Sequence, residues 1–454
     1  MTKQNNHAAT RRDFLKTSMV AAAGTAAFNG LSLVRSTHAA GSDVLRVGLI
    51  GCGSRGPGAA QNAMAADAGV RLVAMADVLP SRVQSRREML KKQTPTQVEV
   101  DDAHCFSGLD GYKHVIQCVD VVLIACSAKF HPMYLRAAIE AGKHVFVEKP
   151  HAIDPVGVRE VTAACELAKQ KNLSVMSGLQ SRYDLGFQEA IQRIHDGAIG
   201  EIVSIEENFL RPPYRLSVRE PKMTEVEYQF STQYHFSWLS GDDIPQSLVH
   251  NLDRATWAMN GQTPVKAHGL GGRSASFGEI YGNVFDHHSV VYEYANGVRL
   301  YAFCRTQNGC YGEYSSAYFG TKGRCRLFPQ YRIEGEKPWK YHAANAATSQ
   351  GNAWQMEHNV LFSAIRSGKP VNCGDYMAPS TLLGVMGQLA CYSGKELTWE
   401  QISKSDFVFT PKVEDVRLDM EPPVKPDEKG NYPVPMPGIT EYKIQQAFHA
   451  GHFS

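Results

Sequence analysis

The sequence lacks the features that define several large classes of protein. Lysine and arginine number 47 against 45 acidic residues, so no strong positive field exists to hold nucleic acid or a membrane surface. The ten cysteines are scattered and form no CxxC pair or Cys/His cluster with zinc spacing. Beyond residue 40, no segment approaches the roughly eighteen consecutive apolar residues of a membrane span. A small molecule is therefore the expected partner, and no metal site is predicted.

The composition is that of a folded protein. Of the 454 residues, 43% are hydrophobic and 20% are charged, which excludes wholesale disorder. At roughly 150 residues per domain, this length predicts two or three folded units.

The first forty residues have the pattern of a signal peptide. The run Arg-Arg-Asp-Phe-Leu-Lys at 11–16 precedes an alanine-rich apolar stretch over 19–34, and two alanines stand at 39–40. This order resembles the twin-arginine export signal, and a basic disordered tail is the alternative interpretation. We expect a periplasmic or secreted protein without a membrane segment after cleavage. Export in the folded state also predicts buried free thiols rather than disulfides.

A dinucleotide-binding motif follows the leader. An apolar run over 44–50 leads into Gly51, Gly53 and Gly56, then into a helix-like stretch over 59–68 and a second apolar run over 70–76 that ends at Asp77. In such a unit the glycines allow a tight turn, close approach of a pyrophosphate and helix packing, and the acid binds the ribose hydroxyls. Because Asp77 also repels a 2′-phosphate, NAD is predicted rather than NADP. The alternative for a GxGxxG alone is a surface loop.

Further strand and helix signals alternate to about residue 180. Apolar runs over 119–125 and 144–147 read as buried parallel strands, separated by a helix over 132–141. Glu148 and Lys149 come directly after the second run, at the end of a strand where ligands of parallel sheets bind. Residues 44–180 are therefore predicted to form a doubly wound Rossmann domain.

These residues resemble the Gfo/Idh/MocA family of NAD(P)-dependent oxidoreductases, most of which act on sugars and cyclitols. The resemblance rests on the GxGxxG, on Glu148-Lys149-Pro150 after a strand, and on His250 with Asp253 three residues later. Further motifs, at 286–287, 292–298, 319–323 and 380–382, resemble the secreted, twin-arginine-exported branch. The family implies a second α+β domain over 181–400 with a mainly antiparallel sheet, and a homo-oligomer.

The resemblance also implies roles for single residues. Lys149 and His250 match the groups that handle the proton of a substrate hydroxyl, and a structural ion pair with Glu148 is the alternative for Lys149. His131 matches a residue on the nicotinamide side, with a helix cap as its alternative. Expected cofactor-binding residues are Gly51, Gly53, Ser54, Arg55, Gly56, Asp77, His131, Glu148 and Lys149.

The sequence departs from the family pattern four residues before His250. The usual aspartate is replaced there by Gln246, and an amide is neither a base nor a counter-charge for an imidazolium. Asp242, Asp243 or Asp253 are candidates to supply the missing carboxylate. Of these, Asp253 is expected on the same helix face as His250, where it would orient the ring.

For the remaining candidate site residues, a purely structural role is a stronger alternative. Arg182 and Tyr183 are predicted to contact substrate, together with Gln246 and Asp253, and surface packing is the alternative for the first two. Aromatics at 214, 234, 238 and 311 suit sugar stacking, but core or interface packing suits them better. Residues 401–454 are proline-rich and are expected to be extended, wrapping their own domain or a neighbouring subunit, or to be a flexible tail.

Together these features predict an exported NAD-dependent oxidoreductase acting on a sugar or sugar derivative. Free NAD is scarce outside the cytoplasm, so the cofactor is expected to stay bound and to be restored in each cycle. Either a second sugar restores it, or transient oxidation at C3 drives elimination of a glycosidic substituent, which makes the protein a hydrolase. A non-catalytic nucleotide-binding sensor is a further alternative.

Overall fold

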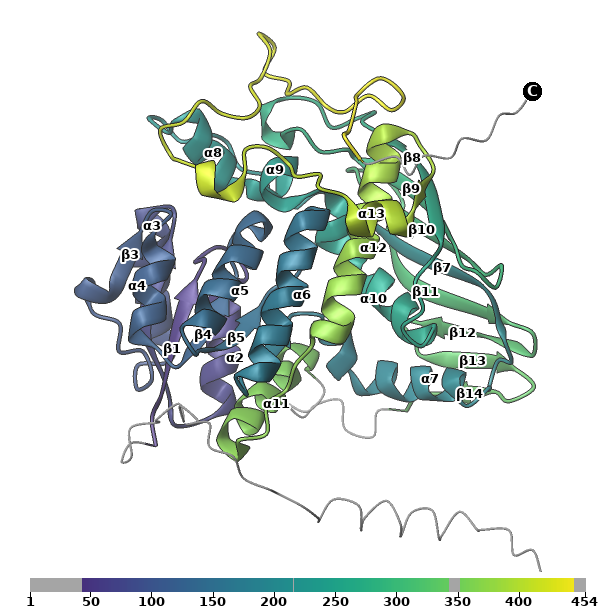
Figure 1. Ribbon diagram of the computed structural model, residues 1–454, viewed down its shortest axis with the longest axis horizontal. Coiled ribbons are helices and arrows are strands. Elements are labelled where there is room, and N and C mark those ends of the chain that lie inside the picture. The colour runs from purple at the N-terminus through teal and green to yellow at the C-terminus, as the bar shows by residue number, and fades with distance from the viewer. Residues whose placement is uncertain (1–42, 215, 343–351, 445–454) are drawn as a thin grey trace, which may run out of the picture. The chain divides into compact units, whose positions relative to one another are not determined.

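The computed structural model describes residues 43–214, 216–342 and 352–444. The leader predicted over residues 1–40 lies outside this range. Two sheets organise the described chain, one with six strands and one with nine. Figure 1 shows the six-stranded sheet among helices α2 to α6 and the nine-stranded sheet among the later elements.

The first sheet is a parallel Rossmann sheet, as the sequence predicts. Its strand order is β3-β2-β1-β4-β5-β6, and every neighbouring pair is parallel. Its elements are β1 (Leu45–Ile50), α2 (Gly56–Ala66), β2 (Val70–Asp77), α3 (Pro80–Gln93), η1 (Asp102–His104), β3 (Cys105–Ser107), α4 (Gly111–Cys118), β4 (Val121–Ile124), η2 (Ala128–Phe130), α5 (His131–Glu140), β5 (His144–Val147), α6 (Pro155–Gln170) and β6 (Val175–Ser177). Successive strands are added on one side of β1 up to β3 and on its other side from β4 onward. Ligands of such sheets bind at this switch point between β1 and β4.

The second sheet is mainly antiparallel, also as predicted. Its order is β14-β13-β12-β11-β7-β10-β9-β8-β15, and β7 with β10 is the parallel pair among the described strands. The strands are β7 (Ile202–Arg211), β8 (Lys266–Gly272), β9 (His287–Glu293), β10 (Arg299–Thr306), β11 (Glu313–Gly320), β12 (Gly323–Leu327), β13 (Arg332–Gly335), β14 (Trp339–Lys340) and β15 (Leu397–Thr398).

The helices of this half of the chain pack on both sheets. They are η3 (Gln180–Tyr183), α7 (Leu185–His195), α8 (Glu225–Ser231), η4 (Gln233–His235), α9 (Ser237–Ser240), η5 (Ile244–Leu248), α10 (Val249–Ala258), η6 (Glu279–Tyr281), α11 (Ala353–Ser367), α12 (Gly374–Ser393), α13 (Trp399–Lys404) and η8 (Val413–Asp415). Helix α11 returns to the Rossmann sheet and packs against α2, where the amide of Asn62 donates to Gln355 at 2.9 Å. The late helices therefore fasten the second domain to the first.

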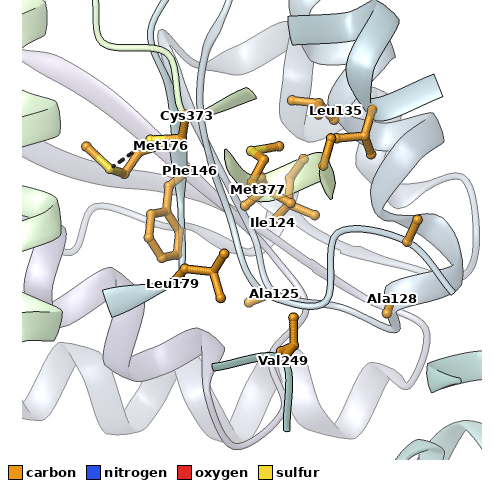
Figure 2. Packing of buried hydrophobic residues seen from close by; sticks show 14 of the residues in the cluster. Ile124, Ala125, Ala128, Leu135, Phe146, Met176, Leu179, Val249, Cys373 and Met377 are labelled. Atoms are coloured by element: carbon orange, nitrogen blue, oxygen red, sulfur yellow. Dashed lines mark hydrogen bonds between the residues drawn. The ribbon is translucent and has the colours of Figure 1, made fainter. Parts of the chain in front are cut away.

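The hydrophobic core runs continuously between the two domains. Figure 2 shows Phe146 and Met176 from the Rossmann strands beside Cys373, with Met377 of α12 and Val249 of α10 in the same cluster. All ten cysteines are free thiols, and six of them are buried. Because this shared core holds the end of β5 and the start of α10 in one packed unit, the polar residues at both places have fixed positions.

Residues 405–444, here called the tail, lie against their own chain. The ammonium of Lys129 donates to the Phe409 carbonyl oxygen at 2.7 Å, and the amide of Gln229 donates to that of Val424 at 2.8 Å. Figure 1 shows this yellow segment passing by α13 and α8. The described part of the tail thus contacts both domains of its own chain. No helix of the described residues is long and apolar enough to cross a membrane.

Candidate active site

The glycine-rich loop between β1 and α2 has the shape that a dinucleotide requires. Gly51 has φ +100°, and a Cβ there would lie 2.4 Å from the Cys126 nitrogen. A Cβ on Gly56 would lie 1.9 Å from the Gly51 oxygen, whereas nothing stands within 4 Å of one on Gly53. The first and last glycines are thus needed for the fold, and the middle one faces open space where a pyrophosphate can approach. The loop fits the cofactor.

Asp77 stands at the end of β2 beside this loop. Its carboxylate accepts hydrogen bonds from the backbone nitrogens of Cys52 at 2.7 Å and Leu79 at 3.0 Å. A small pocket opens there. It is lined by Ile50, Gly51, Gly53, Ala76, Asp77, Val78, Arg82, Gly108, Tyr112, Ala125, Cys126, Ser127, Tyr134, Phe230 and Gln233. This is the position from which the acid can bind ribose hydroxyls.

Arg55 links the glycine-rich loop to the end of β5. Its Nε lies 2.7 Å from a carboxylate oxygen of Glu148, and its Nη2 lies 3.5 Å from Glu357 of α11. Burial and the nearby charge of Glu148 raise the pKa of Glu357 well above its usual value. Glu357 could not be found from sequence spacing, because α11 is some 300 residues from the loop. The carboxylate of Glu148 is thus engaged by Arg55, which removes the basis for a simple Glu148–Lys149 ion pair.

Lys149 reaches from the end of β5 to the second domain. Its ammonium donates to the Gln246 carbonyl oxygen at 2.5 Å and lies 3.4 Å from the side-chain oxygen of Gln246. Burial, partly opposed by the charge of Glu148, lowers the pKa of Lys149 to about 8. An amine with this pKa exchanges a proton readily near neutral pH.

His250 lies one turn after Gln246, where a π-helical turn, η5, runs into α10. Single π turns recur at functional sites. Burial, and after it the charge of Lys149, lowers the pKa of His250 well below its usual value, so the ring is neutral. Its Nδ1 is buried and has no hydrogen-bond partner in the described structure. The described residues therefore leave this nitrogen of the ring without a hydrogen-bond partner.

None of the three candidate carboxylates binds His250 in the described structure. Asp253 accepts from the Arg182 guanidinium at 2.8 Å and from Ser380 at 2.9 Å. The prediction that Asp253 orients His250 is therefore wrong, because the carboxylate of Asp253 is bound by the Arg182 guanidinium instead.

The other two carboxylates are also engaged elsewhere. Asp242 accepts from Tyr392 at 2.5 Å and from His288 at 3.1 Å. Asp243 pairs with Arg211 and accepts from Ser247 at 2.7 Å. Among the residues that the structure describes, no carboxylate takes the place that Gln246 leaves vacant in the family pattern.

Arg182 and Tyr183 lie in packed surroundings. The Arg182 guanidinium stacks on Tyr376 at 4.4 Å and on Trp257 at 4.8 Å while it binds Asp253. The Tyr183 hydroxyl donates to the sulfur of Met176 at 3.0 Å. These contacts favour the packing interpretation over direct contact with substrate.

His131 is buried at the start of α5. One ring nitrogen lies 2.7 Å from the Pro150 carbonyl oxygen and the other 3.1 Å from that of Cys126. It makes no capping bond, because the N-cap position belongs to Phe130, so the cap interpretation is wrong. Burial lowers the pKa of His131 to about 4. The neutral ring has one N–H, so it donates to only one of these two carbonyl oxygens at a time.

A second pocket opens in the second domain, with Arg211, Tyr214, Tyr234 and Asp243 among its lining residues. Arg211 stacks on the Tyr214 ring at 3.6 Å, and Tyr214 stacks on Tyr234 at 4.8 Å. The charges of Arg211 and Asp243 both act on the pKa of Lys149. Arg211 gave no signal in the sequence, because its partners come together only in the fold.

Comparison with known proteins agrees with this geometry. Residues 45–179 match the family model described as the oxidoreductase family with NAD-binding Rossmann fold, GFO_IDH_MocA. The first domain is thus similar to the NAD-binding domains of the Gfo/Idh/MocA oxidoreductases.

Two curated relatives that resemble this chain carry names of different activities. Glycosyl hydrolase family 109 protein 1 of Bacteroides fragilis (strain YCH46) is 30% identical over 167 residues, which are 36% of this chain and 34% of the relative. Inositol 2-dehydrogenase of Pseudomonas fluorescens is 27% identical over 258 residues, 56% of this chain and 66% of the relative. The chain thus spans about a third of the first relative and two thirds of the second.

A solved structure extends the likeness in fold to the second domain. The aldose-aldose oxidoreductase of Caulobacter crescentus, in complex with glycerol, aligns with a TM-score of 0.60 at 19% identity. The alignment covers 78% of this chain and 99% of that one. At this identity the likeness shows a shared two-domain fold.

Proposed function

We propose that this protein is an exported NAD-dependent oxidoreductase that acts on a sugar or sugar derivative. The observation that carries the proposal is the contact of Lys149 with the turn that leads to His250. It joins the cofactor-binding domain to the second domain at one point, beside the glycine-rich loop. A sensor needs the glycines but has no use for a buried amine of lowered pKa beside an unpartnered imidazole.

The chemistry follows from these two groups. Nicotinamide, when bound, accepts or returns a hydride. In the oxidative direction the alcohol must lose its hydroxyl proton as its carbon loses the hydride, and neutral Lys149 accepts that proton. In the reverse direction the ammonium returns the proton to the carbonyl oxygen, and it stabilises negative charge there meanwhile. His250 donates or accepts a hydrogen bond at the same oxygen.

Gln246 changes how the two groups are held. Its carbonyl oxygen fixes Lys149, whereas its amide supplies no negative charge. His250 therefore stays neutral and orients the hydroxyl, and Lys149 carries the proton. This division of roles differs from the pair of a histidine with a nearby carboxylate that the family resemblance implies.

Export bears on how the cofactor is used. If the twin-arginine leader carries the folded protein to the periplasm or beyond, the NAD bound in the cytoplasm must be reset within each cycle. Oxidation of one sugar and reduction of another achieves this. The structural likeness to an aldose-aldose oxidoreductase supports that route, and a homo-oligomer is part of the same proposal.

A second candidate is an NAD-dependent glycoside hydrolase, and the likeness to a family 109 glycosyl hydrolase favours it. Oxidation at C3 acidifies the C2 proton, whose removal expels the glycosidic substituent. Water then adds at C1, the C2 proton returns, and the hydride goes back to C3. The cofactor is restored, and the net reaction is hydrolysis.

One experiment separates the two candidates. The purified mature protein is given nitrophenyl glycosides, or pairs of aldoses, without added nicotinamide. Release of nitrophenol that a Lys149→Ala variant fails to produce identifies the hydrolase, and conversion of aldose pairs to aldonic acid or lactone and polyol identifies the oxidoreductase. If the Lys149→Ala variant turns over either substrate at the wild-type rate, the proposed site is wrong.

A further inference from the structure

A segment of the second domain completes the cofactor pocket. Residues 225–235, here called the cap segment, comprise α8 and η4. Phe230 and Gln233 of this segment line the same pocket as Asp77. Phe230 is buried, and its ring packs on Phe130 of the first domain at 5.9 Å. The guanidinium of Arg82 donates to the Ser231 carbonyl oxygen at 2.5 Å.

Tyr234, in the same segment, reaches the other end of the site. Burial raises the pKa of Tyr234, and its interaction with the side chain of Ser54 in the glycine-rich loop opposes that shift, so the two residues are close neighbours. Its ring stacks on Tyr214, whose hydroxyl is 2.8 Å from that of Ser247. The cap segment thus contacts the adenosine side of the pocket through Phe230 and the phosphate-binding loop through Tyr234.

The tail holds the cap segment from outside. The amide of Gln229 donates to the Val424 carbonyl oxygen at 2.8 Å, while its oxygen accepts from Trp238 at 2.7 Å. The Tyr432 hydroxyl donates to Glu225 at 2.6 Å. Tyr432 is 3% exposed, and its ring meets that of Phe236 edge-on at 4.9 Å. A buried tyrosine bound to a carboxylate is an anchor rather than a passing surface contact.

Arg219 links the cap segment to the loop around η6. Arg219 lies 2.5 Å from Glu225 of the cap segment and 2.6 Å from Glu279. The backbone nitrogen of Gly278 donates to Asn431 of the tail at 2.8 Å. The cap segment, the loop around η6 and the tail are therefore joined by charged and neutral hydrogen bonds.

We propose that the cap segment and the tail form a clamp that retains the dinucleotide, with Phe230 and Gln233 as cofactor-site residues supplied by the second domain. This inference rests on the proposed function in one respect, that the bound molecule is a dinucleotide. Entry and release then require the cap segment to part from Arg82 and Phe130. The tail resists this movement through Tyr432 and Val424.

The test measures release of nucleotide rather than activity. Full-length mature protein loaded with NADH is mixed with a large excess of NAD, and loss of the bound-NADH fluorescence gives the release rate. Tyr432→Phe removes one hydrogen bond to a carboxylate, and release is expected to quicken about tenfold. Gln229→Leu, which cannot bind the Val424 carbonyl, is expected to act in the same direction. Ile439→Ala, at a tail side chain that is 70% exposed, is the matched control and leaves the rate unchanged.

The outcomes separate the clamp from the proposed function. If the wild-type protein binds NADH and both clamp variants release it at the wild-type rate, the clamp is wrong and the proposed function is unaffected. Protein that binds no nicotinamide dinucleotide overturns the proposed function and the clamp with it. Faster release in both variants, with the control unchanged, supports both.

Discussion

At the scale of single residues, the site depends on how burial and charge set the protonation of Lys149 and His250. Burial disfavours the charged form of each, and Lys149 adds like-charge repulsion to His250. The result is one amine that titrates near pH 8 and one neutral imidazole. A carboxylate bound to His250 would favour its protonated form, and the described structure has none there.

The pH dependence of sugar oxidation follows from Lys149. Its pKa of about 8 means that the proton-accepting neutral amine becomes tenfold scarcer with each unit below pH 8. We expect kcat/KM for oxidation to rise to about pH 8 and then level off, and the reductive direction to fall above that pH. Steady-state rates across pH 5–10 measure this. A Lys149→Arg variant, which stays protonated, should be slower by about 10²–10⁴ and lack this rise.

Gln246→Glu tests the electrostatics of the same pair. It places a carboxylate where an amide oxygen now lies 3.4 Å from the Lys149 ammonium. An adjacent negative charge favours the charged form, so the pKa of Lys149 rises and the midpoint of the oxidation profile moves to higher pH. Gln246→Met, which adds no charge, controls for loss of the amide. A profile that moves to lower pH would contradict the placement of these groups.

At the scale of elements, α10 is fixed to the second sheet by a buried polar network. Asn251 donates to Glu207 of β7 at 2.8 Å, and Ser316 and Tyr318 of β11 donate to the same carboxylate. This contact sets the position of α10 and therefore of His250. The network joins residues about 44 to 111 positions apart, so sequence spacing offered no sign of it.

Glu207 predicts a pH dependence of stability. Burial raises the pKa of Glu207 from 4.5 to about 7, so the folded protein keeps a proton that the unfolded chain releases. The free energy of unfolding should therefore fall as pH rises from about 4.5 to about 7, by about 3 kcal/mol from this group. Urea unfolding at pH 5 and pH 7 measures it. Glu207→Gln should remove the dependence, whereas Glu206→Gln on the same strand should keep it.

Local elements were predictable because their signals are local. The strand before Gly51, the helix after Gly56 and Asp77 at the end of β2 are specified within some thirty residues, and the structure has them where the sequence puts them. Lys149 at the end of β5 was placed by the same logic. Its contact with Gln246 spans 97 positions, and only the packing of the two domains creates it.

At the scale of the whole molecule, the two-domain organisation was predictable, but the contacts that hold the two domains and the tail together were not. Alternating strand and helix signals indicate the Rossmann sheet, and the aromatic strand runs indicate the second sheet. The return of α11 to α2 and the anchoring of Tyr432 at Glu225 depend on contacts across about 200 to 300 positions. Such contacts are absent from any short stretch of sequence, yet they bring both domains and the tail around one pocket.

Retention of the cofactor is tested by the nucleotide content of the protein as purified. The folded mature protein, freed of unbound nucleotide, is denatured, and any released dinucleotide is identified by mass spectrometry and quantified by absorbance. A retained cofactor predicts NAD or NADH at close to one molecule per chain, together with turnover that needs no added nicotinamide. Protein that emerges empty and works only with nicotinamide supplied from solution would contradict a retained, internally restored cofactor.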